Sequence, residues 1–118
     1  MADSFEDLSV YRHAFRFSTS LYKRTLVGVM RQDFAFTDQL RRALLSITNN
    51  IAEGYERDLV KEKRYFFRVA KGSAGEVRSM LHFAVEIHYI TKEEHETYCA
   101  AVRQVSRQLA GYARYLAR

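Results

Sequence analysis

QLRRALLSITNNIAEG, residues 39–54, is the stretch that decides the fold of this 118-residue chain. Its apolar residues recur three and four positions apart, so they line one side of a helix that must pack against a partner surface. They are Leu40, Ala43, Leu44, Ile47 and Ile51. Gly54 stands where helices commonly end in a left-handed residue. We therefore expect an amphipathic helix that ends near Gly54, with Thr37 as its N-cap.

Three further helices can be read along the chain. The first begins near Asp7 and extends to about Val27–Met30, and Asp58 is expected to cap the third. Thr91 followed by Glu94 fits a capping box at the start of the fourth helix. The chain has no proline and five glycines, which favours helices with short connections. The sequence predicts one all-α domain, residues 1–118, folded as an antiparallel up-down-up-down four-helix bundle.

The inward faces of these helices follow from the same spacing. The first helix carries Tyr11, Ala14, Phe15, Ser18, Leu21, Tyr22, Leu26 and Val29 on one side. The expected stripe of the third helix is Phe66, Val69, Ala70, Ser73, Val77, Met80, Leu81 and Ala84. The fourth helix has a heptad-like seam of Tyr98, Val102, Val105, Leu109, Tyr112 and Leu116.

The stretch 39–54 closely resembles the signature of the 23S rRNA-intervening-sequence protein family. Further matching stretches are FEDLSVY (5–11), FFRVAKGSAGEVRSML (66–81) and ITKEEHETY (90–98), in the family's order. These are small four-helix-bundle proteins that include the accessory variability determinant of diversity-generating retroelements. The resemblance implies a homopentamer. Thr48 departs from the pattern, since relatives often carry proline there, so the second helix is expected to run without a proline bend.

The third helix has more apolar surface than one bundle core requires. Phe67, Ala74 and Val85 extend its inward stripe on one flank, and Tyr65 and Phe83 extend it on the other. Two mid-helix glycines should each cost about 1 kcal/mol relative to alanine unless close packing recovers it. We therefore expect a homo-oligomer whose interface includes a small-residue patch and nearby residues, namely Phe67, Gly72, Ala74 and Gly75.

Polar residues of the second helix have two interpretations. Asn50 lies at the margin of the apolar stripe, where a buried amide would fix the register between helices. Asn49 shares the outward side with Arg42, Ser46 and Glu53, which form either a solvated face or a polar subunit contact. Arg41 flanks the stripe and is expected to pair with a carboxylate or a phosphate. We include Asn49 and Asn50 among the candidate interface residues.

Basic residues are also arranged in stripes. Nineteen Lys and Arg against fourteen Asp and Glu give a net charge of +5, so five copies would carry +25 and attract polyanions. Six of these residues form one stripe opposite the apolar face of the third helix: Arg57, Lys61, Arg64, Arg68, Lys71 and Arg78. A second stripe on the fourth helix consists of Arg103, Arg107, Arg114 and Arg118. Such stripes are either solvated faces or a phosphate-binding surface.

Catalysis and metal binding have little support in the sequence. His95 and Cys99 are four residues apart, but no third orienting group is evident, and a packed cysteine is the expected role. His82 and Glu86 are also four apart, yet the chain lacks the Glu-x-x-His pairs of a di-metal bundle. It also has no P-loop, GxSxG or CxxC motif. We expect no catalytic residue, no metal site and no cofactor.

The sequence also indicates the cellular location of the protein. The N-terminus MADSFEDL is acidic and lacks the apolar run of a secretory signal, and no segment has the ~18 apolar residues of a membrane span. A single cysteine suits a reducing cytoplasm. We therefore expect a cytoplasmic protein with no membrane partner.

Two functions remain open at this point. The first is a non-enzymatic oligomer that binds RNA or DNA through phosphate and shape, because no zinc-finger, RRM or KH motif occurs. For this function the resemblance implies either a protein encoded within an rRNA intervening sequence or an accessory protein that binds template RNA and a reverse transcriptase. The second is a structural or protein-interaction oligomer with no nucleic-acid role.

Overall fold

The computed structural model describes residues 3–117, which form helices joined by turns, with no β-strand in that range. Four α-helices and two short 3-10 helices follow in the order η1 (Phe5–Asp7), α1 (Ser9–Arg24), η2 (Val29–Gln32), α2 (Phe34–Glu56), α3 (Val60–Glu86) and α4 (Lys92–Leu116). The all-α prediction is therefore confirmed. Helix α2 runs through Thr48 without interruption, as expected in the absence of proline.

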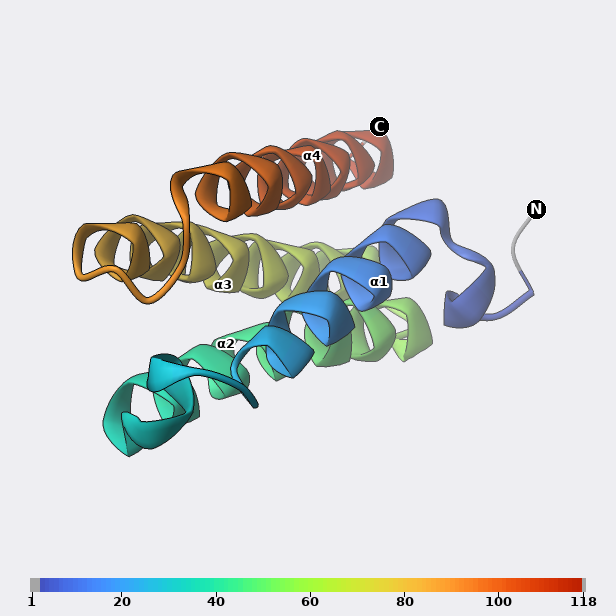
Figure 1. Ribbon diagram of the computed structural model, residues 1–118. Coiled ribbons are helices and arrows are strands. Elements are labelled where there is room, and N and C mark those ends of the chain that lie inside the picture. The colour runs from blue at the N-terminus through green and yellow to red at the C-terminus, as the bar shows by residue number, and fades with distance from the viewer. Residues whose placement is uncertain (1–2, 118) are drawn as a thin grey trace.

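The four α-helices pack side by side as an elongated bundle (Figure 1). Consecutive helices run in opposite directions, and α1 and α3 each contact both α2 and α4. The principal-axis extents of 44 × 22 × 20 Å match the length of α3, whose 27 residues span about 40 Å. The predicted up-down-up-down order is thus the order of the fold.

The core is built from one stripe of each helix. All five apolar residues of the stretch 39–54 that define the predicted stripe of α2 are buried. The predicted seam of α4 also faces the core, with Val102, Val105 and Leu109 buried and its aromatic members partly buried against them. In α1 the prediction was only partly right. Phe15 is half-exposed, while the buried residues are Val10, Ala14, Phe17, Ser18 and Leu21.

The inward face of α3 is rotated from the predicted one. Phe67 and Ala74, which we expected on an outer flank facing another subunit, are almost fully buried in the protomer core. Phe67 packs edge-on against Tyr112, with ring centroids 4.9 Å apart. Neither side chain is available to a partner, so their assignment to a subunit interface was wrong. The buried residues of α3 are Phe67, Ala70, Ala74, Val77, Leu81 and Ala84.

Three predicted helix ends also need correction. The N-cap of α2 is Asp33, whose Oδ1 accepts a hydrogen bond from Phe36 N at 3.2 Å, and Thr37 lies buried within the first turn. Helix α1 ends at Arg24, several residues earlier than expected. Leu59, not Asp58, precedes α3, and it provides no side-chain cap.

Gly54 does not end its helix. Helix α2 continues to Glu56, and Gly54 is buried where α2 meets α3. A Cβ at this position would lie 3.1 Å from Phe66 Cβ and 3.2 Å from the carbonyl oxygen of Lys63. The position therefore favours glycine because the two helices approach closely, not because the backbone turns left-handed.

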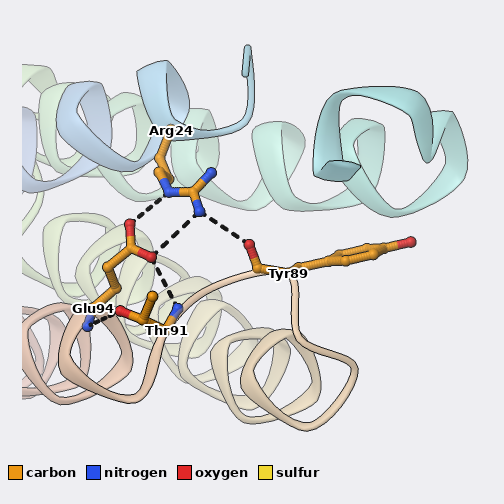
Figure 2. Close-up of polar contacts among 4 residues, drawn as sticks. All are labelled: Arg24, Tyr89, Thr91 and Glu94. Carbon is orange, nitrogen blue, oxygen red and sulfur yellow. Dashed lines mark hydrogen bonds and ion pairs between the residues drawn. The ribbon is translucent and has the colours of Figure 1, made fainter. Parts of the chain in front are cut away.

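A polar network joins the turns at one end of the bundle (Figure 2). Thr91 Oγ1 accepts a hydrogen bond from Glu94 N at 3.1 Å, and Glu94 Oε1 accepts one from Thr91 N at 2.9 Å, which confirms the predicted capping box. Arg24 donates to the Glu94 carboxylate and to the carbonyl oxygen of Tyr89. The Tyr89 hydroxyl donates to Asp33 Oδ2 at 2.5 Å. The end of α1, the start of α2 and the α3–α4 turn are thus linked.

Candidate nucleic-acid interface

Five of the six predicted stripe residues lie on α3, and three of these are exposed to solvent. Lys61, Arg68 and Lys71 are exposed, and none of them forms an ion pair within the described range 3–117. Because these cations are three or seven residues apart, their side chains leave the helix in similar directions. The exposed part of the stripe therefore offers unpaired positive charge along nearly three turns of α3.

Arg64 is partly buried and differs from its exposed neighbours. Its Nε is shielded from solvent and has no hydrogen-bond partner in the described part of the chain. A shielded donor without an acceptor is costly, by about 1–3 kcal/mol when the group is fully buried. Arg64 Nε is thus left without an acceptor among residues 3–117 of the protomer.

Arg57 does not belong to α3. It is the C-cap of α2, with its Nε 3.2 Å from Glu53 Oε2, close enough for an ion pair although not aligned for a hydrogen bond. Its guanidinium also lies over the ring of Phe66, 4.8 Å from the centroid. Arg57 is therefore partly neutralised within the protomer, which corrects its placement in the α3 stripe.

The basic residues of α3 and α4 meet above Cys99. Burial raises the pKa of the Cys99 thiol, while Arg103 of α4 and Arg78 of α3 are close enough to act in the opposite direction. Arg103, Arg107 and Arg114 are exposed on α4, and the remaining predicted member of that stripe, Arg118, lies outside the described residues. One residue of each predicted stripe, Arg78 of α3 and Arg103 of α4, therefore lies near Cys99.

A shallow depression next to the stripe combines cations with aromatic rings. Its walls include Arg57, Lys63, Tyr112 and Tyr115, from the α2–α3 connection, the first turn of α3 and the end of α4. The two tyrosine rings lie 6.0 Å apart. Aromatic faces beside cations are typical of surfaces on which nucleic-acid bases stack. We did not anticipate this depression, because only the i, i+3 spacing of the tyrosines is visible in the sequence.

The small-residue patch is divided between the core and the surface. Gly72 and Gly75 are exposed, and a Cβ at either position would meet no atom within 4 Å. No close helix crossing within the protomer explains these glycines. Ser73, between them, shares a 2.7 Å hydrogen bond with Ser46 of α2.

The two asparagines of α2 have different surroundings. Asn50 is partly buried and donates to the backbone oxygen and the hydroxyl of Ser46, at 2.8 and 3.0 Å. Since Ser46 contacts Ser73 of α3, Asn50 supports the α2–α3 contact inside the protomer. Asn49 is exposed beside an apolar groove between α1 and α2 that also contains Phe15 and Leu45. Asn49 is therefore the one of the pair that is accessible to a second subunit.

Arg41, in the stretch 39–54, makes its contacts within the protomer. Its Nε donates to Thr25 Oγ1 at 2.9 Å, and its Nη2 donates to the backbone oxygen of Thr25 at 3.3 Å. The guanidinium also lies 5.1 Å from the ring centroid of Tyr22. Arg41 thus satisfies the C-terminus of α1, and it pairs with no carboxylate in the described residues.

Comparison with known proteins agrees with this fold. The family model for 23S rRNA-intervening sequence proteins matches residues 6–111. The chain belongs to this family. A solved structure with a similar fold is a protein of unknown function from the S23 ribosomal protein family of Bacteroides thetaiotaomicron VPI-5482. It is 21% identical, with a TM-score of 0.80 over 88% of this chain and 97% of that one. The comparison with curated proteins gave no match.

Family membership assigns no chemistry to the surfaces described above. The match begins before α1 and ends within α4, so all four helices belong to the family pattern. At 21% identity the structural likeness shows the fold alone. Within residues 3–117, no helix is both long and apolar enough to cross a membrane.

Proposed function

We propose that this protein is a non-enzymatic accessory protein that binds the phosphates of RNA or DNA through the basic face of α3. The observation that carries the proposal is the row of exposed, unpaired cations formed by Lys61, Arg68 and Lys71. On a solvated helix face, cations can pair with carboxylates three or four residues away. This row has no such pairs.

Arg64 and the tyrosine depression support the same function. Once the Arg64 side chain turns outward, its unsatisfied Nε–H would donate to a phosphate oxygen, and charge-assisted bonds of this kind are among the strongest hydrogen bonds. Tyr112 and Tyr115 line the depression near the start of α3, and the exposed ring of Tyr115 offers a face on which a single-stranded base can stack. Backbone contacts with stacking would bind nucleic acid with little dependence on base sequence.

The proposal includes assembly of the chain into a homo-oligomer. Exposed apolar side chains occur on every α-helix of the protomer, among them Phe15, Phe34, Leu45, Phe83 and Tyr115. Contiguous apolar patches commonly contact another subunit, and Phe15 and Leu45 line one such groove. A pentamer is the stoichiometry that the family resemblance suggests, and a reverse transcriptase is the protein partner that it suggests. A cytoplasmic location is part of the same proposal.

Salt-dependent binding of RNA and DNA tests the nucleic-acid function. Fluorescence anisotropy with labelled oligonucleotides is expected to give an affinity that falls steeply with salt, because each neutralised phosphate releases counterions. The triple variant Lys61→Gln, Arg64→Gln and Arg68→Gln should lower the log–log slope by about 0.7 per lost contact for single strands, or 0.9 for duplex. It should weaken binding to all sequences similarly.

The matched control removes the same charge from α1. Arg12, Arg16 and Lys23 are exposed there, so changing all three to glutamine alters net charge equally without touching α3. Only the α3 variant should lose affinity. If the parent and the α3 variant bind nucleic acid equally at the same ionic strength, the stripe is only a solvated face. Absence of binding by the parent would instead favour a structural or protein-interaction oligomer.

A further inference from the structure

Two histidines and the cysteine meet between the end of α3 and the start of α4. His82 comes from α3, and His95 and Cys99 come from α4. Each offers one ligand atom, and these atoms all lie within 4.8 Å of one another. Nδ1 of His82 is 2.8 Å from Nε2 of His95. His82, which lies thirteen residues before His95, supplies the third group that the sequence did not reveal.

We propose that His82, His95 and Cys99 bind a divalent transition-metal ion of the zinc type. Two imidazole nitrogens and one thiolate suit Zn²⁺ and exclude the oxygen-preferring Mg²⁺ and Ca²⁺. In a tetrahedral site, Zn–N bonds of about 2.0–2.1 Å and a Zn–S bond of about 2.3 Å place the ligand atoms roughly 3.3–3.6 Å apart. The observed separations run from 2.8 Å, between the two imidazole nitrogens, to at most 4.8 Å among the three ligand atoms. Side-chain shifts of roughly 1 Å would bring them to the tetrahedral distances.

The ligands sit on elements that hold them in place. His95 and Cys99 are one helical turn apart near the beginning of α4, just after the capping box at Thr91 and Glu94. Cys99 is buried, whereas His82 is exposed. The thiolate therefore forms the inner side of the site, and the fourth coordination position faces solvent, where water can bind.

A bound ion would change what connects α3 to α4. The two imidazoles are joined by a hydrogen bond, in which one ring nitrogen donates and the other accepts. Coordination requires a lone pair from both nitrogens and a deprotonated sulfur, so binding replaces this single hydrogen bond by three metal–ligand bonds and releases protons. The ion would thereby cross-link the two helices and stabilise the folded chain.

Cobalt titration of the tag-free, metal-stripped full chain tests the site. Co²⁺ alone should produce the visible bands of a tetrahedral complex and an intense thiolate-to-cobalt charge-transfer band at one ion per chain. Zn²⁺ should then abolish both. Since Cys99 is the only cysteine in the sequence, the charge-transfer band identifies the ligand without any variant. Cobalt spectra without that band would overturn the proposal.

Variants separate this site from general histidine binding. His82→Gln removes an exposed ligand, and Cys99→Ser removes the buried one. Each should weaken Co²⁺ binding by more than the roughly 10–100-fold typical of losing an outer-shell partner. His88→Asn is the control, because His88 has φ 63° and asparagine tolerates that backbone. If His82→Gln binds Co²⁺ as the parent does, the site does not exist. If Cys99→Ser loses its helical circular dichroism signal, the result for His82→Gln decides the test.

Discussion

Arg24 Nε lies 2.5 Å from Glu94 Oε2, so the last residue of α1 is held against the first turn of α4. A second guanidinium nitrogen is 3.3 Å from Glu94 Oε1 and 3.1 Å from the carbonyl oxygen of Tyr89. Both side chains are largely shielded from solvent, at 24% and 30% exposure. Glu94 therefore has two roles, since it caps α4 and also anchors α1.

The ion pair predicts a loss of stability in acid. The hydrogen bond from Arg24 holds the pKa of Glu94 below its usual range. The lowered pKa means that the unfolded chain takes up this proton first as pH falls. The stabilisation is complete above the unfolded value of 4.5 and is lost as pH drops through the folded value. Urea unfolding measured from neutral pH to below pH 4 should show this decline.

Glu94→Gln isolates the contribution of the ion pair. Glutamine can still complete the capping box, so the variant removes the charge and keeps the cap. We expect a loss of about 0.5–1 kcal/mol at neutral pH, the upper part of the range for partly exposed pairs. Part of the decline in acid should disappear with it. An unchanged pH profile would assign the decline to other carboxylates, such as Asp33, whose pKa is lowered by the hydrogen bond from Tyr89.

Thr91→Ala should destabilise α4. It removes the hydroxyl that accepts from Glu94 N, at an expected cost of about 0.5–2 kcal/mol in the free energy of unfolding. Thr91→Ser keeps the acceptor and should stay close to the parent. Thermal unfolding followed by circular dichroism compares the two. Equal losses in both variants would mean that the methyl group, not the cap, matters at this position.

The sequence predicted some local features of the fold, although the N-caps expected at Thr37 and Asp58 were wrong. The capping box depends on residues 91–94 alone, and the stripe of α2 depends on residues within one helix. The inward face of α3 was harder because apolar or small residues occupy adjacent positions at Phe66–Phe67 and Ser73–Ala74. Periodicity cannot choose between two neighbouring faces of similar polarity. Packing against Tyr112 and the other helices makes that choice.

Contacts between segments that are distant in the sequence could not be predicted from helical periodicity. The basic stripes were visible because they repeat within a helix, but the pairing of Arg57 with Phe66 depends on the α2–α3 turn. Likewise, His82 reaches His95 only because α3 and α4 are antiparallel. The glycine at position 54 was assigned to a helix end because its close neighbour lies on another helix.

Gly54→Ala should therefore be costly, whereas Gly72→Ala should not. A methyl group at position 54 meets Phe66 and the Lys63 backbone, and overpacking of this kind typically costs about 1–3 kcal/mol. At position 72 the added Cβ meets open space, so the gain in helix propensity of up to about 1 kcal/mol should remain. Chemical denaturation of both variants gives the comparison. A stabilised Gly54→Ala variant would refute the close-approach explanation.

Gly75→Leu tests whether the exposed part of the small-residue patch joins subunits. Within the protomer a side chain at position 75 points into open space, so leucine should stabilise the isolated helix. If α3 packs closely against another copy there, the same change should weaken assembly by about 1–3 kcal/mol. Light scattering at micromolar concentration should then report an oligomer for the parent and a smaller mass for Gly75→Leu.

The control for this prediction is Ala100→Leu, which adds bulk at an exposed site on α4 and should keep the parent mass. A monomeric parent would end the oligomer proposal, and an unchanged mass for Gly75→Leu would move the interface to another apolar surface, such as the groove beside Asn49.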